Sequence, residues 1–366
     1  MNPFDMKSLT IGNLQARLPI VQGGMGVGIS MAGLASAVAD EGGIGVISTA
    51  CVGMFEPDIA KNYVEANIRA LKNEIRKARE MTKGILGVNI MVALTNFSDM
   101  VRTSIDEGID IIFAGAGLPL DLPKYLHEAA TTKLVPIISS ARAAGVIAKK
   151  WVEKFNYLPD AFVLEGPKAG GHLGFKAEQI EDGAFSLQNL LAQVLETIRP
   201  IGEKHGREIP VIAGGGVYTG EDAFNLLDAG AAGVQMATRF VTTTECDASE
   251  AFKNTYLQCR KEDIRIIESP VGMPGRAIRN QFLDAVSDGK KHPVNCPYHC
   301  IVTCREKESP YCIALALLNA QKGRMSHGFA FAGENAYRTD KIISVKELFT
   351  TLIEEYGIAA RMSPVT

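Results

Sequence analysis

Short, almost continuous apolar runs alternate with longer stretches of helix-like spacing through the first two thirds of the chain. The runs are rich in Val, Ile and Ala and lack polar residues at alternate positions, which is the pattern of parallel strands buried on both faces. Eight runs of this kind lie at 19–25, 43–49, 86–91, 111–117, 134–140, 161–166, 210–216 and 233–238. The pattern therefore predicts eight parallel strands.

Amphipathic stretches fill the gaps between these runs, at 31–41, 57–81, 99–107, 142–155, 186–201 and 221–229. Strand–helix units joined by right-handed crossovers predict a closed TIM (β/α)8 barrel. An open doubly wound sheet is the competing architecture, but it seldom uses eight strands in such regular succession. Because the regular pattern stops near residue 265, we expect a barrel over 1–264. Residues 265–366 are expected to form an irregular, partly helical appendage packed on it, with a terminal helix at 345–356.

Glycines and polar residues follow the predicted strands where a barrel of this type carries its functional residues, at the carboxyl ends. Examples are Gln22-Gly23-Gly24-Met25, Asn89, Gly115-Ala116-Gly117, Glu165, Gly214-Gly215-Gly216 and Gln235-Met236-Ala237-Thr238. Loops after the seventh and eighth strands of barrels often bind phosphate through backbone amides. The glycines after the seventh strand and the Thr238 hydroxyl fit such a site. The alternative is that these glycines only relieve crowding at the barrel rim.

The sixth strand ends in the segment EGPKAGGHLG, residues 165–174. The paired glycines Gly170 and Gly171 permit positive φ and let backbone amides approach a ligand. His172 is the side chain in this segment that can exchange protons near neutral pH. Glu165 and Asn89 are polar residues within apolar strands, and buried polar groups need partners from the protein or a ligand. A glycine-rich turn with a solvated histidine is the alternative interpretation.

Composition narrows the classes of function. The chain has 366 residues, 46% hydrophobic and 22% charged, with a net charge of −3, so nothing favours nucleic acid or an acidic membrane surface as a partner. The N-terminus does not resemble a signal peptide, and no apolar run is long enough to span a bilayer. We therefore expect a cytoplasmic protein with reduced cysteines that acts on a small molecule. Apolar stretches such as 313–318 are compatible with a homodimer.

The segments PIVQGGM, GVNIM, EGPKAGGHLG, PVIAGGG and GVQMATRF together resemble the nitronate monooxygenase (2-nitropropane dioxygenase) family. This family includes the flavin-dependent enoyl-acyl-carrier-protein reductases II. The resemblance covers roughly residues 15–260 and implies a TIM barrel that binds FMN. It implies that Gly23, Gly24 and Met25 lie beside the isoalloxazine, that Asn89 and Glu165 contact flavin or ribityl groups, and that His172 is catalytic. The ribityl phosphate end would be held by Gly170, Gly171, Gly214, Gly215, Gly216, Gln235, Met236, Ala237 and Thr238.

Two positions depart from the family pattern. Pro167-Lys168 stands before AGGH, where relatives usually have another residue followed by an acidic or small one, and Lys168 changes the charge at the pocket mouth. Ala237 stands where a glycine is usual. Alanine keeps the backbone amide, so a phosphate contact survives if φ at Ala237 is negative. The first departure bears on the substrate more than on the cofactor.

Four cysteines cluster in the appendage, Cys296, Cys300, Cys304 and Cys312, with His299 between the first two. Their C-x3-C-x3-C-x7-C spacing allows three interpretations. The thiols could bind zinc or an iron–sulfur cluster, they could lie on one helical face as small core residues, or they could have redox or other roles. The usual C-x2-C knuckle is missing, which favours core thiols over a metal site, and no metal ligand is included among the predicted site residues.

The resemblance leaves two enzymatic hypotheses and one non-enzymatic one. In the first, the protein oxidises alkyl nitronates with dioxygen to a carbonyl compound and nitrite, and His172 hydrogen-bonds the nitronate or acts as base on the nitroalkane. In the second, NAD(P)H is the co-substrate and FMN passes hydride to an enoyl thioester. A cationic mouth near Lys168 would suit a phosphopantetheine or nucleotide phosphate in that case. The third is a flavin- or metal-binding regulatory protein, and only the appendage supports this hypothesis.

Overall fold

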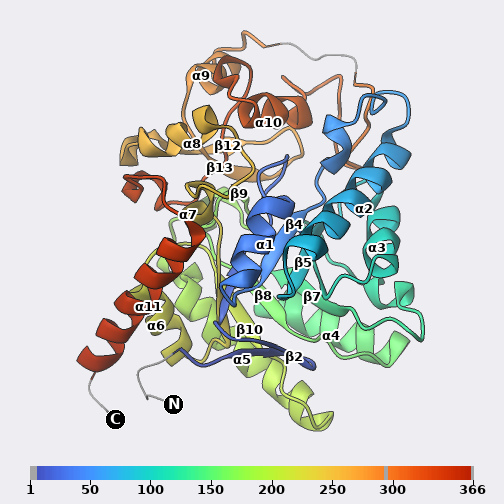
Figure 1. Cartoon of the computed structure of the whole chain (residues 1–366), viewed down its shortest axis with the longest axis vertical. Coiled ribbons are helices and arrows are strands. Elements are labelled where there is room, and N and C mark those ends of the chain that lie inside the picture. The colour runs from blue at the N-terminus through green and yellow to red at the C-terminus, as the bar shows by residue number, and fades with distance from the viewer. Residues whose placement is uncertain (1–5, 292–295, 364–366) are drawn as a thin grey trace.

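The protein is built around a closed barrel of parallel strands, seen in a computed structural model that describes residues 6–291 and 296–363 (Figure 1). The sheet order is β3-β11-β10-β8-β7-β6-β5-β4. The strands are β3 (Ile20–Gln22), β4 (Gly45–Ser48), β5 (Leu86–Met91), β6 (Ile111–Gly115), β7 (Lys133–Ile138), β8 (Phe162–Glu165), β10 (Val211–Gly214) and β11 (Gly233–Met236). Hydrogen bonds from Ile44 N to Ile20 O and from Gln22 N to Ile44 O join the two edge strands. The predicted TIM barrel is confirmed, and each predicted run overlaps one strand.

Helices surround the barrel. Seven of the nine helices named next overlap a predicted stretch, and the two within residues 238–257 do not. The helices are α1 (Ala32–Asp40), α2 (Tyr63–Met81), α3 (Phe97–Asp106), α4 (Ala141–Phe155), α5 (Leu187–Lys204), α6 (Gly220–Asp228), α7 (Thr238–Val241), α8 (Glu250–Leu257) and α11 (Val345–Met362). Short 3-10 helices lie at Val52–Phe55, Leu122–Tyr125, Ala177–Gln179, Gly183–Phe185, Lys261–Asp263, Met325–His327 and Ala336–Arg338. Within the described ranges, none of the helices combines the length and apolar character needed to cross a membrane.

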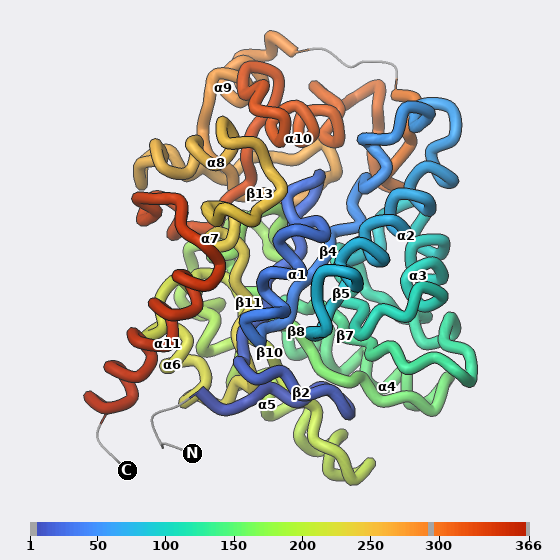
Figure 2. The backbone as a smooth tube through the Cα atoms, viewed as in Figure 1, coloured from blue at the N-terminus to red at the C-terminus, as the bar shows by residue number. Residues whose placement is uncertain are grey.

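The terminal helix α11 returns to the barrel and packs against α6 (Figure 2). The two helices approach so closely that a Cβ on Gly220 would lie 2.1 Å from the Leu352 carbonyl oxygen, so only glycine fits there. The Gly220 amide donates to Glu355 Oε2 at 2.7 Å. Thr219 and Asp222 form a capping box that starts α6, as the sequence of this turn indicates.

Two apolar layers stabilise the barrel. The inner layer contains side chains that point into the barrel, such as Val46, Phe113 and Ile212, together with Leu9 and Ile11. The last two belong to a hairpin, β1 (Leu9–Ile11) and β2 (Leu14–Ala16), which covers the amino-terminal end of the barrel. The outer layer lies between strands and helices. With its amino-terminal end covered, the barrel is open to ligands at the carboxyl ends of its strands.

The part of the appendage that precedes α11 lies over those carboxyl ends, at the top of Figure 1. It contains β12 (Ile264–Glu268), β13 (Pro274–Ile278), α9 (Gln281–Ser287) and α10 (Ile313–Gln321). Strand β13 pairs with β12 on one side and with β9 (Gly171–His172) on the other. The predicted AGGH segment is therefore one strand of a small sheet, and the other two strands come from the appendage.

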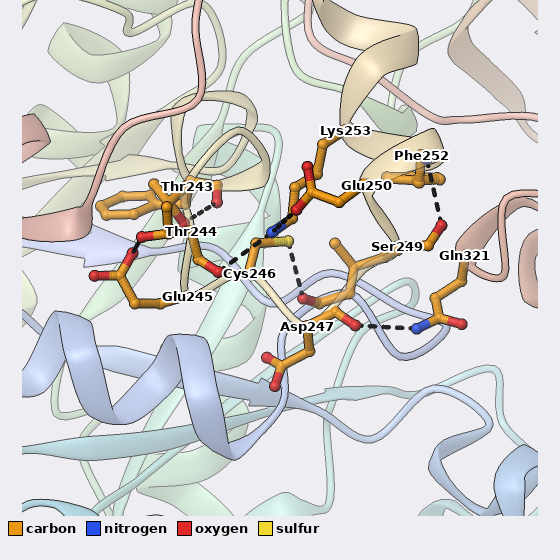
Figure 3. Close-up of polar contacts among 12 residues, drawn as sticks. Thr243, Thr244, Glu245, Cys246, Asp247, Ser249, Glu250, Phe252, Lys253 and Gln321 are labelled. Atoms are coloured by element: carbon orange, nitrogen blue, oxygen red, sulfur yellow. Dashed lines mark hydrogen bonds and ion pairs between the residues drawn. The ribbon is translucent and has the colours of Figure 1, made fainter.

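The segment that follows α7 connects the appendage to the barrel (Figure 3). Asp247 Oδ2 accepts hydrogen bonds from the Met31 and Leu34 amides at the start of α1, at 2.9 and 3.2 Å. Gln321 Nε2, at the end of α10, donates to the Asp247 carbonyl at 3.1 Å. The buried Lys253 donates to the Thr244 carbonyl at 3.3 Å. These contacts hold α10 above the carboxyl end of the barrel.

Candidate active site

A cavity of about 400 Å³ lies at the carboxyl ends of the barrel strands, beneath the appendage. Every predicted site residue except Gly214 lines it: Gly23, Gly24, Met25, Asn89, Glu165, Gly170, Gly171, His172, Gly215, Gly216, Gln235, Met236, Ala237 and Thr238. Gly214 lies just outside the lining, where its carbonyl accepts a hydrogen bond from the Gly166 amide at 2.8 Å. Residues from different strands thus form the wall of a single cavity.

The register of the barrel explains why these residues meet. Gly214 is opposite Glu165 on one side and opposite Gln235 on the other. Met236 is opposite Gln22, directly before the glycines of the first strand end. Because the strands are parallel and end at the same level, residues far apart in sequence become neighbours at the rim.

The Gly23–Met25 loop forms one side of the cavity. A Cβ on Gly24 would lie 2.4 Å from Asn89 Cβ, so this wall is close-packed only because position 24 is glycine. The buried Gln22 holds the loop: its Oε1 accepts from the Val46 amide at 2.9 Å and its Nε2 donates to the Gly23 carbonyl at 2.5 Å. These contacts fix the loop against β4 and β5.

The loops after β10 and β11 form the opposite end of the cavity. Gly215 and Gly216 have φ of +99° and +93°, in the region that favours glycine. Ala237 has φ of −123°, which meets the condition under which its backbone amide remains suited to a phosphate contact. Thr238 Oγ1 accepts from the Gly333 amide at 3.1 Å, which leaves the hydroxyl proton free to donate toward the cavity.

Glu165 and Gln235 form a polar pair in the wall, with Gln235 Nε2 donating to Glu165 Oε1 at 3.2 Å. The carboxyl faces the cavity but is otherwise surrounded by protein, and this burial raises its pKa to about 7. Near neutral pH the group is therefore divided between a carboxylate that accepts hydrogen bonds and an acid that can donate one.

His172 is held by the appendage. The neighbouring Leu173 amide donates to the Pro274 carbonyl at 2.8 Å, and His172 Nε2 shares a hydrogen bond of 2.7 Å with Ser269 Oγ. The edge of the imidazole meets the Phe331 ring, with centroids 5.0 Å apart. Burial lowers the pKa of His172 to about 4, so the ring is neutral at neutral pH. A neutral imidazole offers one donor and one acceptor rather than a positive charge.

Several residues of the appendage complete the site, and sequence reasoning missed them. Arg276 is 3% exposed, and its Nη1 donates to the carbonyls of Pro167 and Ala169 at 2.5 and 2.7 Å. Asn335 Nδ2 donates to the Gly216 carbonyl at 2.7 Å. Arg276 lies in β13, and Asn335 directly precedes the 3-10 helix Ala336–Arg338. Neither belongs to a motif or to the end of a predicted strand, so no sequence signal singled them out.

From the sequence, Lys168 was expected to place a positive charge at the mouth of the cavity. In the structure a carboxylate lies beside it. Its Nζ lies 3.2 Å from Glu334 Oε2, and the two side chains are 61% and 34% exposed. Its aliphatic part packs beside Gly216, within 3.0 Å of where a Cβ would stand. The positive charge is therefore largely compensated, and it stands next to the glycine loop after β10.

Comparison with known proteins assigns the family. A family model described as nitronate monooxygenase matches residues 7–355. The chain belongs to this family. Its resemblance to the family motifs, noted from five short segments, therefore extends over nearly the whole length, appendage included.

Named relatives of this family member catalyse different oxidoreductions. A (3aS,4S,5R,7aS)-5-hydroxy-7a-methyl-1-oxo-octahydro-1H-indene-4-carboxyl-CoA dehydrogenase from Mycobacterium tuberculosis (strain ATCC 25618 / H37Rv) is 30% identical over 273 residues, or 75% of this chain and 66% of the relative. The chain thus spans slightly less than two thirds of that relative's length. A probable nitronate monooxygenase from Staphylococcus aureus (strain Newman) is 25% identical over 310 residues, covering 75% of this chain and 79% of the relative.

Among solved structures, FabK from Thermotoga maritima superposes with a TM-score of 0.71 at 26% identity, and the match covers 94% of each chain. Since this match covers almost the whole chain, it includes the appendage. This chain and that structure therefore share both the barrel and the segment that covers it, and the relatives named above are oxidoreductases whose named reactions differ.

Proposed function

We propose that this protein binds FMN in the 400 Å³ cavity and oxidises a small alkyl nitronate with dioxygen, giving a carbonyl compound and nitrite. The observation that carries the proposal is the convergence of His172 with the strand-end glycines on one cavity. Glycine backbone, a threonine hydroxyl and a buried carboxyl lie on its walls, as a flavin mononucleotide would require.

The cavity suits FMN at both ends. The Gly23–Met25 backbone has no side chain at positions 23 and 24 and would let a ring system approach closely. At the other end, Gly215, Gly216 and the Thr238 hydroxyl are suited to a phosphate. A Cβ on Gly171 would meet no atom within 4 Å, so the space in front of this residue is open. When bound, FMN would accept the electrons that the substrate loses.

The size and charge of the site favour a small substrate. Cofactor and ligand sites span about 300–1,000 Å³, and a cavity of about 400 Å³ lies near the lower end of that range. The neutral His172 can donate a hydrogen bond to a nitronate oxygen. Because its pKa is about 4, it is a weak base at neutral pH, which favours a preformed nitronate over a neutral nitroalkane as substrate.

Reduction of an enoyl thioester by NAD(P)H is the second candidate. The similarity to a relative named for a carboxyl-CoA substrate supports it, as does the exposed Lys168 at the mouth. The ion pair of Lys168 with Glu334 counts against it, because a phosphate would have to compete with the carboxylate. The cofactor and the cavity are the same in both candidates, but electrons flow in opposite directions.

A paired assay distinguishes the two. We expect the purified protein to be yellow, and nitrite to appear when it is given an alkyl nitronate in air without a nicotinamide. Bleaching by NADH or NADPH without air, followed by reoxidation by a crotonyl thioester but not by a nitronate, would support the reductase instead. A colourless protein that cannot be reconstituted with FMN would exclude both.

The location of FMN can be tested separately with a pair of glycine variants. Gly171 and Gly206 have similar positive φ of +77° and +65°, and a Cβ on either would meet no atom within 4 Å. Both Gly171→Ala and Gly206→Ala therefore impose similar backbone strain. Only the first adds a methyl group to the cavity, so we expect it alone to weaken FMN binding, by roughly tenfold or more. Equal affinities in the two variants would contradict this placement.

A further inference from the structure

A second cavity, of about 340 Å³, lies within the appendage and is lined by all four clustered cysteines. Cys296, Cys300, Cys304 and Cys312 share its wall with Thr95, His299 and Tyr311, among others. None of these residues lines the first cavity. Four cysteines from one short stretch of chain therefore line a space that the proposed FMN site does not use.

The path of the backbone brings these thiols together. The structure has no helix between Cys296 and Cys304, so the interpretation of these cysteines as one helical face is wrong. The chain turns at His299, which has φ of +44°. Ile301 then forms an isolated bridge with Leu94, so this part of the appendage lies against the barrel loop after β5. The cysteines thus surround the cavity from a loop, which is how ligands to a metal centre are commonly arranged.

Two polar atoms in the wall of this cavity lack hydrogen-bond partners among the described residues. The Tyr311 side chain is 7% exposed, and its hydroxyl has no hydrogen-bond partner among the described residues. Glu306 Oε2, on the same wall, also lacks one, and the nearest cation candidate, His299 Nδ1, is 3.8 Å away. Buried polar atoms are rarely left unpaired. A polar or ionic group therefore belongs in the cavity.

The arrangement of the thiols indicates what kind of group fits. Within residues 6–291 and 296–363, no three Cys, His, Asp or Glu side chains converge closely enough to hold a single metal ion. A lone zinc ion needs four donors around one point. In an iron–sulfur cluster the cysteines bind different iron atoms, so their sulfur atoms are spread around the cluster. Four thiols around a cavity of about 340 Å³ match the second arrangement.

We propose that the second cavity holds a [4Fe–4S] cluster bound by Cys296, Cys300, Cys304 and Cys312. Each thiol loses its proton when it binds iron. The Tyr311 hydroxyl then donates a hydrogen bond to a cluster sulfur, the kind of contact that tunes the reduction potential of such clusters. Nothing in this proposal depends on the FMN site or on the reaction proposed for it.

The two cavities are close neighbours. Ile313 lines the second and Leu317 lines the first, and both belong to α10. Four helical residues rise about 6 Å, so one turn of helix separates the two walls. A cluster in the appendage would therefore stand beside the candidate FMN site.

The test is the iron and acid-labile sulfide content of the full chain, purified without oxygen and reconstituted with ferrous iron and sulfide. We expect about four of each per chain, with a paramagnetic signal after reduction by dithionite. Cys304→Ser should reduce the iron content to less than one per chain, since Cys304 is only partly buried and the substitution should leave the fold intact. Cys259→Ser, a cysteine outside the cluster, is the matched control and should keep all of the iron.

Three results would overturn the proposal. One is a chain that binds zinc but no iron, and another is a chain that binds no metal after reconstitution. The third is full iron content in Cys300→Ser and Cys304→Ser, both shown to be folded by circular dichroism. If a variant does not fold, the iron and sulfide content of the wild-type chain still decides the question.

Discussion

Arg276 is predicted to hold the candidate active-site loop in place. It is 3% exposed, and its guanidinium donates to the carbonyls of Pro167 and Ala169, directly before the Gly170-Gly171-His172 segment. Burial lowers the pKa of Arg276, while the carboxylates of Glu334 and Glu181 act in the opposite direction. Removing the side chain would leave the buried carbonyl of Pro167 and the partly buried carbonyl of Ala169 without this donor.

The magnitude follows from these two contacts. A hydrogen bond to a charged group contributes about 1.5–3 kcal/mol, so two of them contribute about 3–6 kcal/mol. Removing Arg276 also removes the cost of burying a cation, so we expect Arg276→Ala to lower the free energy of unfolding by the smaller value, about 3 kcal/mol. Arg276→Lys keeps the charge but loses the planar fork of donors, and should lie between the alanine variant and the wild type.

Urea denaturation of the full chain measures this difference. The fluorescence of Trp151, the single tryptophan, and far-UV circular dichroism should give coincident transitions if unfolding is cooperative. Arg279→Ala is the matched control, because Arg279 pairs with Asp284 at 2.8 Å on the surface, where such pairs contribute at most about 1 kcal/mol. If Arg276→Ala loses no more stability than Arg279→Ala, the role given to Arg276 is wrong.

Two further predictions concern protonation in the cofactor-free protein. Burial raises the pKa of Glu165 from 4.5 to about 7, so the native state keeps a proton that the unfolded chain loses, and this group lowers stability as pH rises from about 4.5 to 7. Glu165→Gln should therefore gain stability relative to the wild type across that range in urea titrations, and parallel curves would contradict the assignment. Burial lowers the pKa of His172 to about 4, so its imidazole resonances should titrate near pH 4 by NMR, with His172→Gln identifying them. A midpoint near 6.5 would show that the ring is solvated.

The barrel could be predicted because two sequence signals indicate its strands. One is the apolar run, and the other is the set of glycines and polar residues at the carboxyl end of the run. Gly214 and Glu165 illustrate this: each ends an apolar run, and the parallel register then places them opposite each other. The β1–β2 hairpin could also have been predicted, because Leu9 and Ile11 alternate with polar residues before a Gly12-Asn13 turn. Its short strands were not among the predicted runs. Helix α11 was correctly placed at its start but continues to Met362.

The part of the site contributed by the appendage could not be predicted. Strand β9 is two residues long, too short to have any period, and its pairing with β13 depends on residues about a hundred positions away. The requirement for glycine at position 170 has the same origin, because a Cβ there would lie 2.5 Å from the carbonyl carbon of Ala332. Sequence motifs correctly marked these glycines as special, but part of the reason is chain packing rather than ligand contact.

The division of the site between barrel and appendage has a consequence for substrate choice. The strand ends of the barrel provide the glycine backbone and the hydroxyl of Thr238 that suit the cofactor, and these positions follow from the fold itself. His172 instead takes its orientation from β13 and Ser269, and the loop before it is held by Arg276. A change in the appendage can therefore reposition the groups that face a substrate without altering the cofactor surface. On this reasoning, exchanging Ser269 or Arg276 should alter turnover of the substrate more than affinity for FMN.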